Sequence, residues 1–326
     1  MQAESRPSFH VMADLKDYPV IVLVGATAVG KTACSLALAE QLDAEIVSVD
    51  SRQIYRYMDI GTAKPTVEER ARIPHHLVDC LEPTVTYSAG RYASEAQTII
   101  ADILQRGRRA LVVGGAGFYL QALMDGLFQE PEKNQDIRSA LRQRAREELP
   151  ENLHAELAKI DPDAASVLST NDVQRVVRAL EVAYSSGVPM STLHRNQTLK
   201  PLAWPARWFG LRRDRAELYD RINRRVDVMM QDGLLAEAKD LLDRGFKPEL
   251  EALRTVGYQE IFAHFAGEYT LEKAHQLIQQ HTRNYAKRQY TWFRKESRIT
   301  WIDMQPATIG GDVVDEIMAN ILHESQ

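Results

Sequence analysis

Two features of this sequence could act on a phosphorylated substrate, and the first is a glycine-rich loop. Residues 25–32 read Gly-Ala-Thr-Ala-Val-Gly-Lys-Thr, which matches the G-x-x-x-x-G-K-[ST] pattern of a phosphate-binding loop. In such a loop the backbone N–H groups turn toward a phosphate, and the following helix adds the positive end of its dipole. Lys31 would then place a positive charge on a terminal phosphate, and the Thr32 hydroxyl would hold Mg²⁺. The alternative, a strand–helix turn without a ligand, is disfavoured because the complete motif is present.

The second feature is a carboxylate that should face the same ligand. Asp50 ends an apolar run that starts at Glu45, and this run predicts a second buried strand. In an open parallel α/β sheet, ligands bind outside the carboxyl ends of the strands. Asp50 should therefore lie at the mouth of the phosphate loop. Two other roles stay open for it, a helix N-cap and an indirect ligand of Mg²⁺.

Two further loops follow predicted strands. The polar segment 51–65 comes directly after Asp50 and contains Gly61 and Pro65, which break helices, so we expect a functional loop there. The predicted strand Ala110–Val113 is followed by Gly114–Gly117 and not by the acidic residue that a nucleotide hydrolase often carries at this point. This argues against an ATPase. The glycines are expected to let a substrate backbone or a leaving group come close.

The elements that would position these groups indicate an α/β fold, a P-loop-type parallel sheet flanked by helices. Val20–Val24 is a short β-branched apolar run and predicts the strand before the loop, with a helix at Thr32–Leu42 after it. A helix capped by Ser88 should run through Gln105. Other short runs predict strands at Leu77–Cys80, Arg207–Leu211 and Arg298–Asp303. Adjacent histidines on a strand point to opposite faces, so a structural role is preferred over a metal site for His75 and His76.

The composition changes after Gly126, where charged residues at helical spacing replace the strand pattern. Helices are expected at Asp136–Leu149, Leu153–Lys159, Pro162–Leu168 and Asn171–Ser186, which predicts an all-helical insertion domain. The expected division is a catalytic core at 17–127, the helical insertion at 128–198, a second part of the core at 199–304, and tails at 1–16 and 305–326.

Composition and charge restrict the function further. The chain has 326 residues, of which 44% are hydrophobic and 26% charged, so global disorder is excluded. The net charge of −5 argues against a nucleic-acid-binding protein, but two local clusters of basic residues oppose this. One cluster spans 207–225, and the other spans 283–298 with aromatic residues interleaved. Together they indicate a groove for a polyanion such as RNA.

The two cysteines, Cys34 and Cys80, have no metal-binding spacing and suggest a reducing compartment. No signal peptide or long apolar span is visible, so we expect a cytoplasmic protein without a membrane partner, and we expect a monomer.

The assembled motifs resemble those of the tRNA dimethylallyltransferase family, also called tRNA isopentenyltransferases. The resemblance extends from about Val20 to Trp301. Beside the phosphate loop, it depends on Asp50-Ser51-Arg52-Gln53-Ile54-Tyr55, Asp59–Pro65, Gly114-Gly115, Asn171–Leu180, Arg254–Glu260 and Lys287–Arg294.

The resemblance implies transfer of a dimethylallyl group from dimethylallyl diphosphate to N6 of the adenosine just 3′ of the anticodon of tRNA. The loop would then grip the diphosphate leaving group, and Asp50 would accept an N6 proton. Thr27 would orient the diphosphate or its bridging oxygen, while Lys31, Arg225 and Mg²⁺ neutralise the departing charge. The adenine would have to be flipped out of its stack. The implied diphosphate-binding residues are Gly25, Ala26, Thr27, Ala28, Val29, Gly30, Lys31 and Thr32.

The resemblance also implies contacts with the anticodon stem-loop of tRNA. Ser51 and Gln53 are candidates to read the edge of the base. The implied contacts are Asp50, Ser51, Arg52, Gln53, Ala116, Arg138, Gln174, Arg175, Val176, Val177, Arg178, Arg254, Thr255, Val256, Gly257, Tyr258 and Gln259. One departure affects this set: the family usually has threonine where this chain has Ala116. A contact made by that hydroxyl is therefore lost here, whereas a contact made by the backbone would survive.

Two other hypotheses remain at this point. An adenylate isopentenyltransferase or a small-molecule P-loop kinase would use a free nucleotide, which needs neither the helical insertion nor the basic–aromatic region. An RNA-binding adaptor with a relic nucleotide fold would not need Lys31, Thr32 and Asp50 together.

Overall fold

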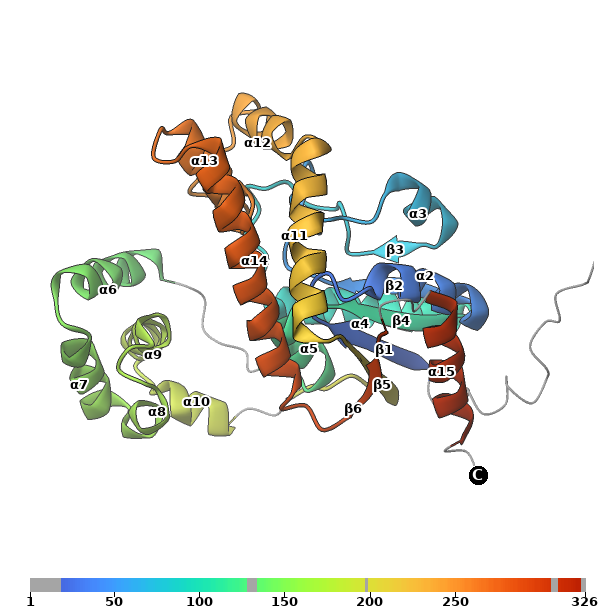
Figure 1. Ribbon diagram of the computed structural model, residues 1–326. Coiled ribbons are helices and arrows are strands. Elements are labelled where there is room, and N and C mark those ends of the chain that lie inside the picture. Colours follow the sequence, from blue (N-terminus) through green and yellow to red (C-terminus); the bar gives the residue numbers. More distant parts are fainter. Residues whose placement is uncertain (1–18, 128–133, 197–198, 306–309, 324–326) are drawn as a thin grey trace, which may run out of the picture. The chain divides into compact units, whose positions relative to one another are not determined.

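The computed structural model describes residues 19–127, 134–196, 199–305 and 310–323 (Figure 1). The chain forms two compact units, the first made of Met1–Met124 with Leu202–Gln326 and the second of Asp125–Pro201. The insertion expected at 128–198 lies inside the second unit.

The first unit is built on a six-stranded sheet in the order β3-β2-β4-β1-β5-β6, and every strand pair is parallel. Strand β1 lies inside the sheet, where Val20 is paired with Ala110 on one side and with Ala206 on the other. All six residues of β1 are buried, as its apolar run predicts for a strand covered on both faces. The strands are β1 Val20–Gly25, β2 Ala44–Val49, β3 His75–His76, β4 Arg109–Gly114, β5 Ala206–Arg212 and β6 Ile299–Asp303.

The third strand differs from the prediction. It comprises His75–His76 and pairs with Ile46 and Val47 of β2, whereas a strand was expected at Leu77–Cys80. Leu77 has φ 60° and Asp79 has φ 59°, in the left-handed region that a strand does not use. The backbone therefore turns away from the sheet directly after His76, and the expected strand is wrong.

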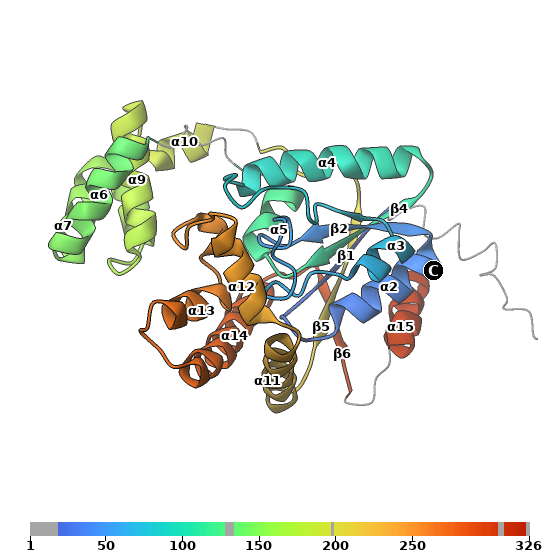
Figure 2. The ribbon, with the colours of Figure 1, turned by 90° about the horizontal axis from the view of Figure 1, so that it is seen from above.

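Helices cover both faces of the sheet, with α4 and α5 over one face and α2 and α15 over the other (Figure 2). Ile21 and Leu23 of β1 belong to a core cluster that includes Leu38 of α2 and Val313 of α15. The Ser88 hydroxyl accepts a hydrogen bond from the Arg91 N–H at the start of α4, so the predicted cap is confirmed. The helices of this unit are α2 Lys31–Leu42, α3 Val67–Arg72, α4 Ala89–Gln105, α5 Gly117–Met124, α11 Arg215–Gln231, α12 Leu234–Asp243, α13 Tyr258–Phe265, α14 Leu271–Phe293 and α15 Gly310–His323, with a short 3₁₀ helix at Glu251–Leu253.

Helix α15 corrects the prediction that 305–326 is a tail. Val313, Val314, Ile317 and Ile321 are buried and pack into the core beside α2. These residues form one apolar stripe at helical spacing, so the signal for this helix is present in the sequence.

The second unit is helical throughout its described residues, as the insertion was predicted to be. Its helices are α6 Gln135–Glu147, α7 Pro150–Ile160, α8 Pro162–Val167, α9 Val173–Ser186 and α10 Met190–Asn196, the last of which was not predicted. A separate apolar core joins α6, α7, α8 and α9. Within the ranges that the structure describes, no helix has the length and apolar character needed to span a membrane.

Candidate active site

The phosphate loop connects β1 to α2 in the first unit, as its motif predicts. Gly25 is held tightly: a Cβ at this position would lie 2.8 Å from the Leu211 carbonyl oxygen. Gly30 has φ 119° at the start of α2, a conformation that a side chain disfavours. The motif's two glycines are therefore required by the close approach of β5 and by the turn into the helix.

Lys31 is folded back onto the loop. Its Nζ donates hydrogen bonds to the carbonyl oxygens of Gly25 and Ala26, both at 2.9 Å. Burial, followed by repulsion from Arg225, lowers the pKa of Lys31 to about 8, and the charge of Asp50 opposes this decrease. The two predicted charged partners thus lie within electrostatic range of the lysine: Asp50 directly after β2, and Arg225 on α11.

Three arginines fix the loop from the side of β5 and α11. The Arg225 guanidinium donates to the Thr27 hydroxyl at 3.2 Å, so these two predicted site residues are in contact. Arg221, one turn earlier on α11, donates to the Ala28 carbonyl at 2.9 Å, and Arg213 donates to the Val29 carbonyl at 2.8 Å. From the sequence, Arg213 and Arg221 were assigned only to the basic cluster 207–225 and not to the phosphate loop. The i, i+4 spacing of Arg221 and Arg225 on one helix face is the signal that could have found Arg221.

Asp50 directly follows β2 and caps the next turn. Its Oδ1 accepts hydrogen bonds from the backbone N–H groups of Arg52 at 2.8 Å and Gln53 at 3.2 Å. No helix begins at Asp50, so these bonds hold a turn, and the helix N-cap that the sequence left open is wrong. Both bonds use Oδ1, and within the described part of the chain Oδ2 takes no hydrogen bond. The charge of Asp50 also helps to raise the pKa of Tyr285, after burial as the main cause. One oxygen therefore positions the carboxylate and the other can accept a proton.

Gln53 has a structural role that limits how it could read a base. Its Nε2 donates to the carbonyl oxygens of Thr62 at 3.2 Å and Ala63 at 3.1 Å. The donors of this amide are thus used to hold the loop 59–65, and its carbonyl oxygen is the group left for a base. Ser51 is half-buried beside it.

The glycines after β4 correct a prediction. A Cβ at Gly114 would lie 2.1 Å from the Val49 carbonyl oxygen, one at Gly115 would lie 2.2 Å from Gln289 Nε2, and one at Gly117 would lie 2.3 Å from the Trp292 ring. Protein atoms therefore occupy the space that was expected to admit a substrate or leaving group. The half-buried Ala116 donates its N–H to the Val49 carbonyl at 3.2 Å.

The loop after Asp50 is anchored by a carboxylate from α12 that the sequence did not reveal. Glu237 accepts hydrogen bonds from three successive backbone N–H groups, those of Asp59, Ile60 and Gly61, at 2.8, 2.8 and 2.9 Å. The Tyr258 hydroxyl donates to the same carboxylate at 2.6 Å. Loop 59–61 is therefore fixed to α12 and α13 by one side chain.

The residues expected to contact tRNA differ in how far their side chains are buried. Val176, Val177 and Tyr258 are at most 4% exposed, so only their backbone could reach an RNA. Asp50, Ser51, Arg52 and Ala116 are partly buried, Gly257 is buried, and Thr255 and Val256 are half-buried. The residues with exposed side chains are Gln174, Arg175, Arg254 and Gln259.

In the second unit, Glu181 brings together two of the predicted arginines. This carboxylate is fully buried and accepts from Arg138 Nε at 2.7 Å and from Arg178 Nη1 at 2.8 Å. It also accepts the backbone N–H of Asn134 at 3.1 Å. Residues that are 40 or more positions apart in the sequence are thus held in one charged cluster.

The histidine pair has the structural role that was preferred for it. His76 Nε2 lies 2.7 Å from Glu45, and His75 Nδ1 lies 2.7 Å from the Ile73 carbonyl. Hydrogen bonds, first from Arg106, lower the pKa of Glu45 to about 2. No group of three His, Cys, Asp or Glu side chains suited to a metal occurs in the described parts of the chain.

The Mg²⁺ expectation depends on Thr32 alone among the protein groups. Thr32 is exposed at the first turn of α2, next to Lys31. Mg²⁺ commonly keeps several waters and takes oxygen atoms of a bound phosphate, so one hydroxyl beside a diphosphate fits its preferences.

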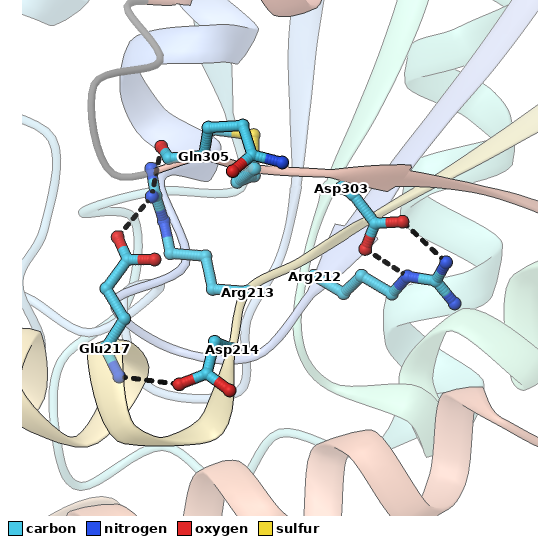
Figure 3. Close-up of a pocket in the computed structure, with 7 residues that line it drawn as sticks. Arg212, Arg213, Asp214, Glu217, Asp303 and Gln305 are labelled. Carbon is cyan, nitrogen blue, oxygen red and sulfur yellow. Dashed lines mark hydrogen bonds and ion pairs between the residues drawn. The ribbon is translucent and has the colours of Figure 1, made fainter.

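A hollow lies beside Arg213, at the ends of β5 and β6. It has a volume of about 550 Å³, and two ion pairs lie in its lining (Figure 3). Arg212 pairs with Asp303 at 2.5 Å, and Arg213 pairs with Glu217 at 2.5 Å. Because Arg213 also bonds to Val29, it separates this hollow from the phosphate loop. The lining residues are Arg212, Arg213, Asp214, Glu217, Asp303, Met304 and Gln305.

Comparisons with known proteins agree with the resemblance. A family model described as IPP transferase matches residues 53–296, and one described as Isopentenyl transferase matches residues 18–78. The tRNA dimethylallyltransferase 2 of Geotalea uraniireducens is 45% identical over 298 residues, which cover 91% of this chain and 96% of that protein. The tRNA dimethylallyltransferase of Bacillus subtilis is 45% identical over 289 residues, covering 88% and 91%.

Solved structures give the same result. The full-length tRNA isopentenylpyrophosphate transferase from Bacillus halodurans has a TM-score of 0.70 and 38% identity, covering 94% of this chain and 97% of that one. A eukaryotic dimethylallyltransferase acting on tRNA has a TM-score of 0.77 and 28% identity, covering 92% and 79%.

Proposed function

The chain belongs to the tRNA dimethylallyltransferase family, and we propose that it transfers a dimethylallyl group from dimethylallyl diphosphate to N6 of the adenosine just 3′ of the anticodon in tRNA. The observation that carries this proposal is that Asp50, Lys31 and Arg225 lie within electrostatic range of one another beside the phosphate loop. Strand β4 ends in glycine and not in the acidic residue that a nucleotide hydrolase often has there.

The reaction needs a base and a stabilised leaving group. The N6 amine attacks C1 of the allyl group, the N6–C1 bond forms as the C1–O bond breaks, and diphosphate leaves with the electron pair of that bond. Oδ2 of Asp50 takes the N6 proton, while Oδ1 stays bound to two backbone N–H groups that fix its direction. The carboxylate is thus oriented before the substrate arrives.

The charge that develops on the departing diphosphate is met by groups that are already in place. Lys31 and Arg225 would supply positive charge, and the Thr27 hydroxyl, which accepts a hydrogen bond from Arg225, would bind the bridging oxygen. Preorganised charges of this kind act mainly on the transition state, where the leaving oxygen becomes most negative. We propose that Thr32 holds Mg²⁺ on the diphosphate, where the ion would neutralise further negative charge.

Contacts with the anticodon stem-loop complete the proposal. In the first unit Arg254 and Gln259 present exposed side chains, and in the second Gln174 and Arg175 do so from the start of α9. Arginine side chains that reach phosphates would make binding sensitive to salt. The buried Val176, Val177 and Tyr258 would support these surfaces from beneath.

The acceptor is the feature to test. Purified protein is incubated with Mg²⁺ and dimethylallyl diphosphate, together with either an anticodon stem-loop RNA that carries the adenosine or AMP. The proposal expects a prenylated adenosine in the RNA and none from AMP. Transfer to AMP at an equal or higher rate would show an adenylate isopentenyltransferase instead.

A further inference from the structure

Gln289 links the phosphate loop to the loop after β4. It lies on α14, is 6% exposed, and faces the sheet together with Ala286 and Phe293, which are also buried. Its Oε1 accepts the backbone N–H of Thr27 at 2.8 Å, and its Nε2 donates to the Gly115 carbonyl at 3.0 Å. Both ends of one buried amide are thus satisfied by the backbones that leave β1 and β4.

The fit around this amide is close. A Cβ at Gly115 would lie 2.2 Å from Gln289 Nε2, so only glycine leaves room for the side chain there. Hydrogen bonds of a buried amide are costly to break when its donor and its acceptor are both paired. Gln289 therefore keeps the two loops in a fixed position relative to each other.

The bond to Thr27 changes what the phosphate loop can do. In a phosphate loop the backbone N–H groups point to the anion. Here the N–H of Thr27 is already used by Gln289, so an incoming diphosphate has to bind the later N–H groups. The Thr27 hydroxyl is fixed from the other side by Arg225, which donates to it at 3.2 Å.

We propose that Gln289 is a positioning residue for the transfer step: it withdraws the Thr27 N–H from the anion cradle and thereby aims the Thr27 hydroxyl at the bridging oxygen of the allylic diphosphate. This inference deepens the proposed function and depends on it. Gln289 acts through Thr27, so it should affect the rate of transfer more than the binding of the diphosphate.

The first test replaces Gln289 by methionine, which is of similar length and makes neither hydrogen bond. We expect Gln289→Met to reduce kcat by about 10- to 100-fold, since a misplacement of about 1 Å can have that effect. The Kd for dimethylallyl diphosphate, measured calorimetrically without RNA, should stay within about threefold of the wild-type value. Gln280→Met, at an exposed position of the same helix, is the control and should behave like the wild type.

A second variant separates positioning from packing. In Gln289→Glu the protonated carboxyl can donate to Gly115 and accept from Thr27, as the amide does, whereas the charged form cannot donate. Burial raises the pKa of such a carboxyl. The ratio of the variant's rate to the wild-type rate should therefore rise as the pH falls from 8.5 to 5.5, by about tenfold per unit above that pKa.

A third measurement does not depend on the reaction. Hydrogen exchange of the peptide that contains Thr27 should be faster in Gln289→Met than in the wild type, and unchanged in Gln280→Met. If the wild type prenylates no RNA, the proposed function fails, but exchange and diphosphate affinity still decide the role of Gln289. The inference is overturned by a wild-type kcat in Gln289→Met, by affinity lost in parallel with the rate, by a pH-independent rate ratio, or by unchanged exchange at Thr27.

Discussion

Binding of dimethylallyl diphosphate should depend on pH through Lys31. Burial and the charge of Arg225 lower the pKa of this lysine from 10.5 to about 8 in the free protein. A diphosphate beside Nζ would favour the charged form and raise that pKa again. Binding should therefore be coupled to uptake of a proton whenever the free lysine is neutral.

The expected change in the Kd for dimethylallyl diphosphate follows from the two pKa values of Lys31, in the free protein and with the ligand bound. If the ligand restores the ordinary value, the apparent Kd is constant below pH 8, rises about tenfold per pH unit above it, and is about 300-fold weaker beyond pH 10.5. The ligand itself keeps a constant charge in this range, because the last ionisation of a phosphate lies near pH 6.

Calorimetry of dimethylallyl diphosphate binding without RNA, from pH 7 to pH 10, measures this directly. At pH 8 about half a proton should be taken up per ligand, which is seen by comparing buffers of different ionisation enthalpy. Lys31→Arg is the control, since its guanidinium stays charged and its Kd should not follow pH. A wild-type Kd that is flat from pH 7 to pH 10, or a Lys31→Arg curve with the wild-type slope, would refute the reasoning.

The same lysine affects stability with a defined sign. Between pH 8 and pH 10.5 the unfolded chain binds more protons at this position than the folded chain, so the free energy of unfolding rises with pH. Below pH 8 the full cost of burying the charge is present, on the order of 3 kcal/mol at roughly 1.4 kcal/mol per pKa unit. Lys31→Met should remove this pH dependence in urea unfolding.

Three substitutions test other contacts. Gly115→Ala should displace Gln289 and lower the transfer rate about 10- to 100-fold, measured in single turnover; a wild-type rate would contradict the close fit. Glu237→Gln leaves at least one of three backbone N–H groups without its acceptor and should lower the free energy of unfolding by about 1–3 kcal/mol, measured by urea with an unchanged m-value; an unchanged midpoint would disprove the anchor. Glu181→Gln removes the fully buried carboxylate that pairs with Arg138 and Arg178, and it should destabilise the second unit by about 3 kcal/mol. Hydrogen exchange should become faster in α6 and α9 and stay unchanged in the first unit.

The local parts of the fold and site could be predicted from the sequence. The phosphate loop, β1 and the cap of α4 each depend on residues within one short segment, and the structure confirms them. The bonds of Asp50 to the N–H groups of residues 52 and 53 are also local, but they hold a turn, whereas the alternative considered from the sequence was a helix N-cap.

The contacts that complete the site could not be predicted, because they join distant segments. The Thr27–Gln289 hydrogen bond joins residues 262 positions apart. Glu237 lies more than 170 positions from the loop 59–61 that it binds. No short-range periodicity encodes such a pair. The early end of β3 depends on the left-handed backbone of Leu77, which its residue type does not suggest.

The expected tRNA contacts show a different limit. The resemblance named unbroken runs such as 174–178, but neighbouring residues on a helix point in different directions. Gln174 and Arg175 are exposed, whereas Val176 and Val177 are in the core of the second unit. The hydrophobic stripe of α9 could have separated them.

The most direct test of the central claim is nucleoside mass spectrometry of tRNA after a single turnover with wild-type protein and with Asp50→Asn. The substitution keeps an oxygen to accept the N–H groups of Arg52 and Gln53 but cannot accept a proton, so the loop should stay in place. We predict prenylated adenosine beside the anticodon with the wild type, a rate about 10²- to 10⁴-fold lower with Asp50→Asn, and dimethylallyl diphosphate bound by both. Wild-type rates of prenylation by Asp50→Asn would contradict the account.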